Sequence, residues 1–142
     1  MKRIGALLCL LLVVDSAAVA AKSKSHPESR TDTDYITALG VANHFLYAWA
    51  SQDHEAGLML LTDNARSHES EDHLEAFFSA APNTRQGFEI SRGKRLHVGR
   101  YSFPIALFEF TLGRKAAIHR RFSQIIVIRA ATKDDWAVDN VP

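Results

Sequence analysis

The hydrophobic period of the sequence changes about half-way along the chain, and this change restricts the fold more than any other feature. From about residue 34 to residue 81 the apolar residues recur three and four positions apart, which is the spacing of amphipathic helices. From about residue 88 to residue 141 the period falls to two, and β-branched and aromatic residues dominate, as in strands. Helices followed by strands predict an α+β domain, with a curved antiparallel sheet that carries the helices on one face.

We expect three helices in the first half. The longest spans residues 34–51, and Asp34 is placed to cap it. Asp53 can cap a short second helix that ends at a turn before the third. Ser70 can cap this third helix, which ends before Pro82 because proline cannot continue a helix.

We expect about four strands in the second half, joined by polar turns near residues 113–115 and 132–134. A hairpin centred on Lys115 would place Phe108 opposite Phe122, and one centred on Lys133 would place Val138 opposite Ile128. The four strands are predicted near Phe88 to Val98, Phe103 to Leu112, Ile118 to Ala130 and Trp136 to Val141.

Cross-strand partners share a face of a sheet, so this register predicts that the even-numbered residues of the last three strands lie beneath the helices. The predicted inner face comprises Phe108, Phe110, Phe122, Ile126, Ile128, Trp136 and Val138, with Gln124 and Asn140 as its main polar members. The predicted outer face carries Glu109, Arg121 and Asp139 together with the aliphatic residues Ile105, Leu107, Ile125 and Val127. Because so many aliphatic residues rarely face water, a homodimer through the outer face is a possible partner interaction.

The first residues of the chain have the pattern of a secretory signal. A short basic segment precedes an apolar run over residues 4–14, and small residues follow at Ala18 and Ala20. We interpret residues 1–20 as a signal peptide, 21–33 as a disordered leader and 34–142 as the domain. An uncleaved anchor is less favoured, because a membrane-spanning helix needs ~20 apolar residues. The protein is therefore expected to be exported, either periplasmic or secreted, with no membrane span after cleavage.

Charge and cysteine content exclude several classes of function. After removal of residues 1–20 the chain has no cysteine and has equal numbers of basic and acidic residues, which argues against a nucleic-acid partner. The charge is unevenly distributed, since residues 21–84 are mainly acidic and residues 85–142 mainly basic. Basic groups at 92–95, 114–115 and 120–121 are interpreted as solvated turns and charged edges in preference to a surface for anions or acidic lipids.

Two segments resemble the nuclear transport factor 2-like superfamily. Residues 42–65, ANHFLYAWASQDHEAGLMLLTDNA, resemble its aromatic-rich first helix, polar turn and short leucine-rich helix, and KDDWAV at 133–138 resembles its closing strand. The resemblance covers nearly all of the domain. It implies a SnoaL-like or cystatin-like cone with a pocket between sheet and helices, in a superfamily that includes polyketide cyclases, ketosteroid isomerases, dehydratases, assembly subunits and secreted domains without known activity.

The favoured function is an exported small-molecule-binding or accessory domain with an apolar pocket and no catalysis. The predicted inner face lacks the Asp, Glu or His that would serve as a general base in the cone. A small hydrophobic ligand would contact Tyr47, Trp49, Phe108, Phe110, Phe122, Gln124, Trp136 and Asn140.

Two alternatives remain open. An enzyme of the cyclase, isomerase or dehydratase kind could use His44 as base, with Tyr47 or Asn140 as hydrogen-bond donor to a developing oxyanion. A purely structural dimer is the third hypothesis. No cofactor or metal is expected, because the histidines of HESEDH at 68–73 are poorly spaced for one ion.

Overall fold

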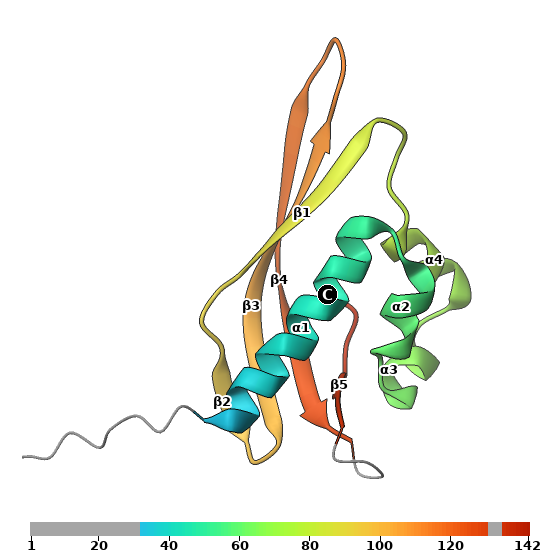
Figure 1. Ribbon diagram of the computed structural model, residues 1–142. Coiled ribbons are helices and arrows are strands. Elements are labelled where there is room, and N and C mark those ends of the chain that lie inside the picture. The colour runs from blue at the N-terminus through green and yellow to red at the C-terminus, as the bar shows by residue number, and fades with distance from the viewer. Residues whose placement is uncertain (1–31, 131–134) are drawn as a thin grey trace, which may run out of the picture.

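The computed structural model describes residues 32–130 and 135–142 of the chain. The predicted signal peptide, the predicted leader up to residue 31 and the predicted turn at 132–134 lie outside the described residues. Helices precede strands, so the predicted α+β class is confirmed (Figure 1). The elements are α1 (Thr33–Ser51), α2 (His54–Met59), α3 (Asp63–His68), α4 (Glu71–Phe78), β1 (Thr84–Ile90), β2 (Lys94–His97), β3 (Arg100–Thr111), β4 (Ala117–Arg129) and β5 (Trp136–Val138).

Helix α1 carries the apolar stripe that the sequence predicts. Its buried residues are Ala38, Ala42, Phe45, Leu46, Ala48 and Trp49. The cap is Asp32 and not Asp34, because the Asp32 carboxylate accepts the backbone N–H of Asp34 at 3.2 Å. The helix ends at Gln52, which adopts a left-handed conformation (φ 60°).

The helical half contains one helix more than predicted. Asp53 caps α2 and Ser70 caps α4, both as expected. The additional helix, α3, starts where the Thr62 hydroxyl accepts the backbone N–H of Ala65 at 2.9 Å. The turn predicted at the end of the second helix falls on Asp63 and Asn64, which instead form the first turn of α3.

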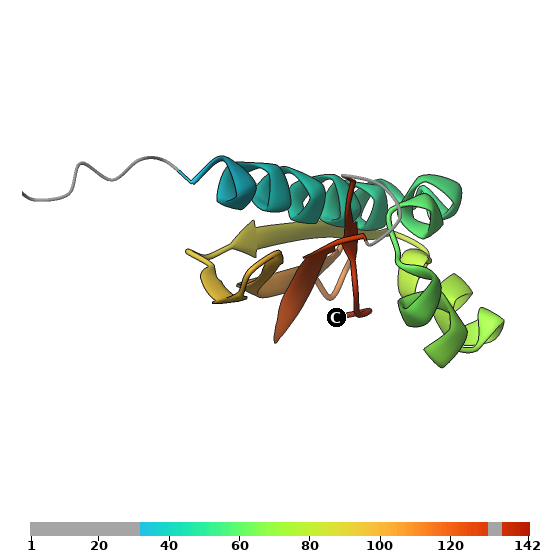
Figure 2. The same cartoon turned by 90° about the horizontal axis from the view of Figure 1, so that it is seen from below.

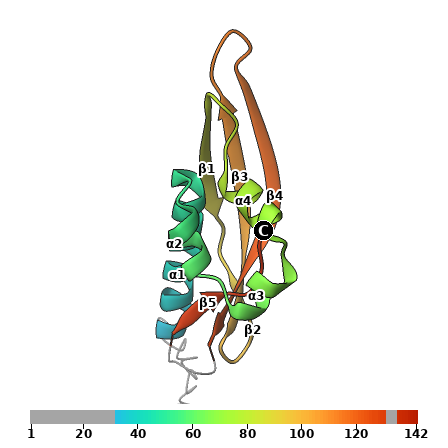
Figure 3. The same ribbon diagram turned by 90° about the vertical axis from the view of Figure 1, so that its right-hand side faces the viewer.

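The sheet is antiparallel with the order β1-β3-β4-β5, and β2 also pairs with β3. Strands β1 and β2 pair with successive parts of β3, so the single first strand of the prediction is interrupted at residues 91–93. Figure 2 shows α1 lying across one face of this sheet, with α2, α3 and α4 grouped at one side. The β3–β4 hairpin extends beyond β1 at one end of the molecule, and the β2–β3 turn lies at the opposite end (Figures 1 and 3).

The register of β3 and β4 differs from the prediction by two residues. Phe108 lies opposite Arg120, and Phe122 lies opposite Ala106. The hairpin is therefore centred on Arg114 and not on Lys115. A shift of two leaves even-numbered residues opposite even-numbered ones, so the members of each face stay together.

The register of β5 against β4 differs from the prediction by one residue. Strand β5 therefore shares its core face with the odd-numbered residues of β4 and not with the even-numbered ones. Val138 pairs with Val127 and not with Ile128. Trp136 and Val138 thus share a face with the odd-numbered residues of β3 and β4, and this odd face is the one that the helices cover. The buried inner face of β3 and β4 consists of Tyr101, Phe103, Ile105, Leu107, Ile125 and Val127.

The predicted choice of inner face was therefore wrong for β3 and β4. Phe122 is 71% exposed, whereas Phe103 and Ile125 are completely buried in the cluster that includes the stripe of α1. The physical cause is the position of Val138, which is held between β4 and the segment that joins α2 to α3. This arrangement fixes which face of the sheet meets the helices.

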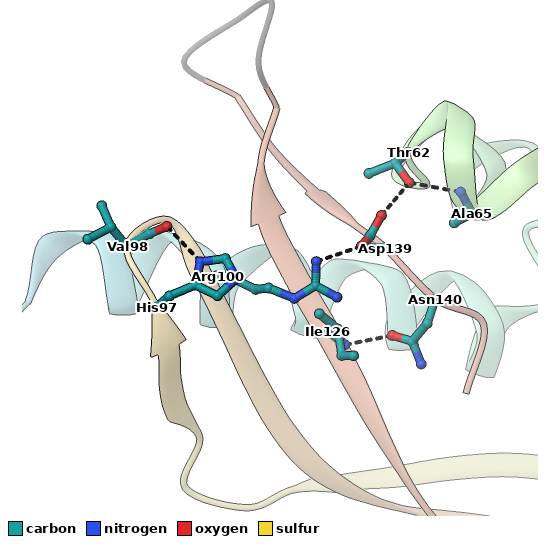
Figure 4. Close-up of polar contacts among 8 residues, drawn as sticks. All are labelled: Thr62, Ala65, His97, Val98, Arg100, Ile126, Asp139 and Asn140. Carbon is teal, nitrogen blue, oxygen red and sulfur yellow. Dashed lines mark hydrogen bonds and ion pairs between the residues drawn. The ribbon is translucent and has the colours of Figure 1, made fainter.

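The C-terminal strand is part of the core. The Val138 N–H donates to the Leu60 carbonyl, and the Thr62 N–H donates to the Val138 carbonyl, each at 2.8 Å. The Asp139 side chain, which is 10% exposed, accepts hydrogen bonds from the Thr62 hydroxyl and the Arg100 guanidinium, each at 3.0 Å (Figure 4). Strands β3 and β5 and the start of α3 are thus joined through one carboxylate.

The end of the domain at which α1 begins is closed by aromatic residues. The Tyr101 hydroxyl donates to the Asp32 carboxylate at 2.5 Å, and its ring packs against Tyr35 and Trp136. Burial and the Asp32 carboxylate raise the pKa of Tyr101 to about 12. The hydrogen bond from Tyr101 in turn lowers the pKa of Asp32, with help from the backbone N–H groups at the start of α1.

Candidate functional site

An open cavity of about 380 Å³ lies at the other end of the concave side, between α4 and the inner face of the sheet. We call it the mouth of the cone. Its wall comes from α1, α4, β3, β4 and the last residue of the chain, and consists of Trp49, His73, Ala76, Phe77, Ser79, Glu109, Arg121 and Pro142.

Aromatic rings form the apolar part of the mouth. Trp49 is 2% exposed and Phe77 is 9% exposed, with their ring centroids 6.2 Å apart. Phe77 also contacts Phe45 and Phe78, with centroids 6.0 and 5.1 Å away. The rings are fixed by the packing of α1 against α4, and because they are almost fully buried they offer only a small apolar surface to the cavity.

The alternation of side chains along β3 and β4 puts two charged residues on the inner face. Glu109 and Arg121 are odd-numbered residues of β3 and β4, so they lie on the inner face, beyond the last buried aliphatic residue, Leu107. Glu109 lies between Gln86 of β1 and His119 of β4 in the cross-strand register. The mouth is therefore the polar continuation of the apolar inner face.

The Glu109 carboxylate of the mouth forms no ion pair within the described residues, whereas Arg121 is already engaged. Arg121 donates to the terminal main-chain oxygen of Pro142 at 3.1 Å, and it forms no ion pair with a side chain of residues 32–130 or 135–142. The Oε1 atom of Gln86, next to Glu109, is buried and has no hydrogen-bond partner in the described chain. His73 instead bonds to Glu69, which lies in the link between α3 and α4.

This arrangement can hold an amphipathic molecule. An apolar portion would pack against Trp49 and Phe77, and a polar or anionic portion would reach Arg121. As for metals, no cluster of three or more His, Cys, Asp or Glu side chains is present among the residues that the structure describes.

Trp49 is the one predicted site residue that lines the mouth. Trp136 is buried in the core, 8% exposed, with the Arg129 guanidinium 5.0 Å from its ring centroid. The Asn140 side chain accepts the Ile126 N–H at 2.6 Å and donates to the Gln124 carbonyl at 3.0 Å, so it extends the pairing of β5 and does not offer its amide to a pocket (Figure 4).

The other predicted positions lie elsewhere. Phe108, Phe110, Phe122 and Gln124 share the outer face, because they are the even-numbered residues of β3 and β4. His44 and Tyr47 are exposed and line a separate open groove with α2, which includes Met59 and Leu60 but no residue of the sheet. The placement of His44 as a base inside the cone is therefore corrected.

The charged residues of the mouth were not predicted as site residues. Glu109 and Arg121 were assigned to the outer face by the same error that placed Phe122 inside, whereas the outward assignment of Asp139 agrees with its bond to the outer-face residue Arg100. The signal that could have found them is the unbroken apolar run of odd-numbered positions from Tyr101 to Leu107.

Solved structures with the same arrangement of helices and sheet establish the fold. A ketosteroid isomerase-like protein from Erwinia carotovora atroseptica aligns with a TM-score of 0.55 at 16% identity, over 77% of this chain and 93% of that one. A protein of unknown function from Shewanella oneidensis, described as nuclear transport factor 2-like, aligns with a TM-score of 0.54 at 16% identity, over 76% and 94%. The chain has the nuclear transport factor 2-like fold.

The association domain of CaMKII from C. elegans also aligns with this chain, with a TM-score of 0.52 at 13% identity over 72% of this chain and 88% of that one. No protein-family model and no curated protein matches the sequence. Identities this low define the fold alone, so function has to be argued from the site. In the described residues no helix has the length and apolar character needed to cross a membrane.

Proposed function

We propose that the chain is an exported small-molecule-binding or accessory domain whose ligand site is the mouth of the cone. The observation that carries this proposal is the open cavity of about 380 Å³ in which Trp49 and Phe77 lie beside Arg121 and Glu109. This volume is in the range of small-molecule sites, ~300–1,000 Å³. Export rests on the signal-peptide pattern of residues 1–20.

The ligand chemistry follows from the wall of the mouth. The buried rings favour an apolar body, and the guanidinium of Arg121 favours a carboxylate, sulfonate or phosphate group at its edge. The proposed ligand site therefore carries charged groups, whereas the apolar pocket predicted from the sequence has Gln124 and Asn140 as its main polar members.

Titration with the anionic aromatic probe 1-anilinonaphthalene-8-sulfonate tests the site. We expect saturable binding that Arg121→Gln weakens about tenfold, the loss typical of a charge-assisted contact. Arg120→Gln is the matched control, because Arg120 is the neighbouring residue on the outer face, 4.3 Å from the Phe122 ring centroid. Equal weakening by both variants, or by neither, would contradict the proposed site.

In the enzymatic alternative, the candidate general base is no longer His44. Among the residues that line the mouth, Glu109 is the only carboxylate side chain, so an isomerase-like or cyclase-like reaction would use Glu109 in place of His44. Glu109→Gln distinguishes the two functions. Binding proposed here survives this substitution, whereas a proton-abstraction activity found on a carbonyl substrate would be abolished by it.

The homodimer is a second proposal with its own observation. The outer face carries an apolar patch, the outer aromatic patch, in which Phe122 is 71%, Ile118 69% and Phe110 36% exposed. The patch continues onto Phe108, and Arg120 lies over the rings of Phe108 and Phe122. A second copy of the chain would bury it. The aliphatic residues first expected at the interface, such as Ile125 and Val127, are in the core instead.

Sedimentation velocity tests the dimer. We expect a dimer that Phe122→Lys converts to monomer, because a charge would be buried in the interface. Met59→Lys is the matched control, since Met59 is 77% exposed on α2 and away from the sheet. A monomeric parent protein at high concentration would contradict the proposal.

A further inference from the structure

The β2–β3 turn and the loop before it form a compact cationic projection. Residues 92–99, which we call the basic hairpin, include exposed Arg92, Lys94, Arg95 and His97 and no acidic residue. None of these four side chains forms an ion pair with another residue that the structure describes. The hairpin therefore presents positive charge to solvent, with Arg95 the cation whose charge acts on the Asp32 carboxylate.

The tip of the basic hairpin is apolar. Val98, in the two-residue turn with Gly99, is 77% exposed, and Leu96 is 44% exposed. Lys94 and Arg95 are consecutive strand residues, so they project to opposite sides and flank the tip. An exposed apolar tip between cations matches the boundary between lipid headgroups and acyl chains.

The root of the basic hairpin is held rigidly. The Gly93 N–H donates to the Tyr35 hydroxyl of α1 at 3.1 Å. A Cβ atom at Gly93 would lie 2.3 Å from the Phe103 ring, so the backbone passes directly over the core. The cations are therefore presented from a fixed platform, and their charge is not spread over a loop that must first be ordered.

Three acidic side chains at this end are already engaged. Asp32 accepts from Tyr101, Asp34 pairs with Arg129, and Asp139 pairs with Arg100. They form no ion pair with the cations of the hairpin, although the charge of Arg95 contributes to the lowered pKa of Asp32. Asp135, before β5, is a further exposed acidic residue at this end.

The chain enters the domain at the same end. Helix α1 begins beside the β2–β3 turn (Figures 1 and 3), so residues 1–31 join the domain there. Residues 21–31, which precede the described part of the chain, contain three Lys or Arg residues and one Glu. The opposite β3–β4 turn also carries two cations, Arg114 and Lys115, but it has no such basic segment joined to it.

We propose that the basic hairpin docks on an anionic phospholipid surface, with Val98 inserted at the headgroup boundary and the mouth of the cone directed away from the membrane. From the sequence alone, the basic residues at 92–95 are interpreted as part of a solvated turn or charged edge. The structure adds the apolar tip, the rigid root and the shared end with the entering chain.

Vesicle flotation of the full chain tests the proposal. Phosphatidylcholine vesicles are compared with vesicles of equimolar phosphatidylcholine and phosphatidylglycerol, so that any hydrophobic contribution of residues 4–14 is common to both. Near-surface cations contribute about 1 kcal/mol each, so the combined variant Arg92→Gln, Lys94→Gln and Arg95→Gln should reduce the partition onto anionic vesicles on the order of 100-fold. At about 1 M salt the preference should disappear.

The matched control is Arg114→Gln with Lys115→Gln at the opposite turn, which should leave the partition unchanged. Val98→Glu, which leaves every cation in place, should also weaken binding to anionic vesicles, and it serves as a second test if the combined variant fails to fold. Equal binding to the two vesicle types, equal losses in the two hairpin variants, or binding of soluble heparin without binding of vesicles would overturn the proposal.

Discussion

Strands β3 and β4 present two apolar faces, and only one of them is covered. On the inner face Phe103 and Ile125 are completely buried beneath α1, whereas on the outer face Ile118 and Phe122 are 69% and 71% exposed. Apolar character alone therefore does not identify the core side of this sheet. The difference follows from where the neighbouring elements dock, and it leaves one apolar surface available for a partner.

Removal of β5 should have the largest effect on this difference between the faces. A chain ending at Asp135 loses Val138, which is fully buried, and the Asp139 carboxylate that joins β3 to α3. A domain stability of ~5–15 kcal/mol does not tolerate the loss of this buried strand at the end of the sheet. We expect no cooperative thermal unfolding transition by circular dichroism. A melting temperature equal to that of the full chain would contradict the role assigned to β5.

Phenylalanine truncation compares the two faces directly. Phe103→Ala should lower the free energy of unfolding by about 3–5 kcal/mol, because it leaves a cavity in the core. Phe122→Ala should lower it by less than about 1 kcal/mol in the monomer, since the ring is 71% exposed. Urea unfolding at low protein concentration measures both. Similar losses for the two variants would remove the distinction between the faces.

The bond across the outer side of β5 should have an intermediate effect. Asp139→Asn should destabilise by about 1–2 kcal/mol, because it weakens the bonds from Arg100 and Thr62 to a carboxylate that is 10% exposed. The control is Asp63→Asn, since Asp63 pairs with Arg66 on the surface and its side chain is 98% exposed. That variant should change stability by less than about 0.5 kcal/mol. The comparison fails if the control costs as much as Asp139→Asn.

The last effect is confined to alkaline pH and concerns the inner face. An unfolded tyrosine titrates near pH ~10, whereas the pKa of Tyr101 is raised to about 12 in the folded protein. The corresponding stabilisation is fully present below about pH 10 and is lost as the pH rises through about 12. Tyr101→Phe should therefore flatten the alkaline part of the stability curve while leaving its slope near neutral pH unchanged. Parallel curves for the two proteins between pH 10 and pH 12 would show that Tyr101 is not the group responsible.

Much of the fold is predictable from local sequence signals. The stripe of α1, the caps at Asp53 and Ser70, and the drop to a period of two are all local features, and each is found in the structure. Local signals also predicted correctly that β3 pairs with β4. Their register is shifted by two residues, which leaves the members of each face together.

The candidate site was much less predictable. The one-residue shift of β5 depends on contacts of Val138 with Leu60 and Thr62, which are about eighty positions away in the chain. No local pattern records such a contact, and both faces of β3 and β4 are apolar enough to serve as a core. The corrected assignment of the faces places Glu109 and Arg121 at the mouth. It places Phe108, Phe110 and Phe122 on the outer face. Of the residues predicted to contact a ligand, only Trp49, whose position depends on the helical period, lines the mouth.

Cysteine accessibility at two adjacent positions of β4 tests the assignment of the faces most directly. In a Cys9→Ser background, which has no other cysteine, Gln124→Cys and Ile125→Cys are labelled with a maleimide at low protein concentration under native conditions. Gln124 is exposed on the outer face and Ile125 is 0% exposed on the inner one. We predict labelling at position 124 at nearly the rate of the unfolded chain, and at position 125 at least about 100-fold more slowly, since reaction there requires unfolding. Rapid labelling at position 125 with protection at position 124 would contradict the account.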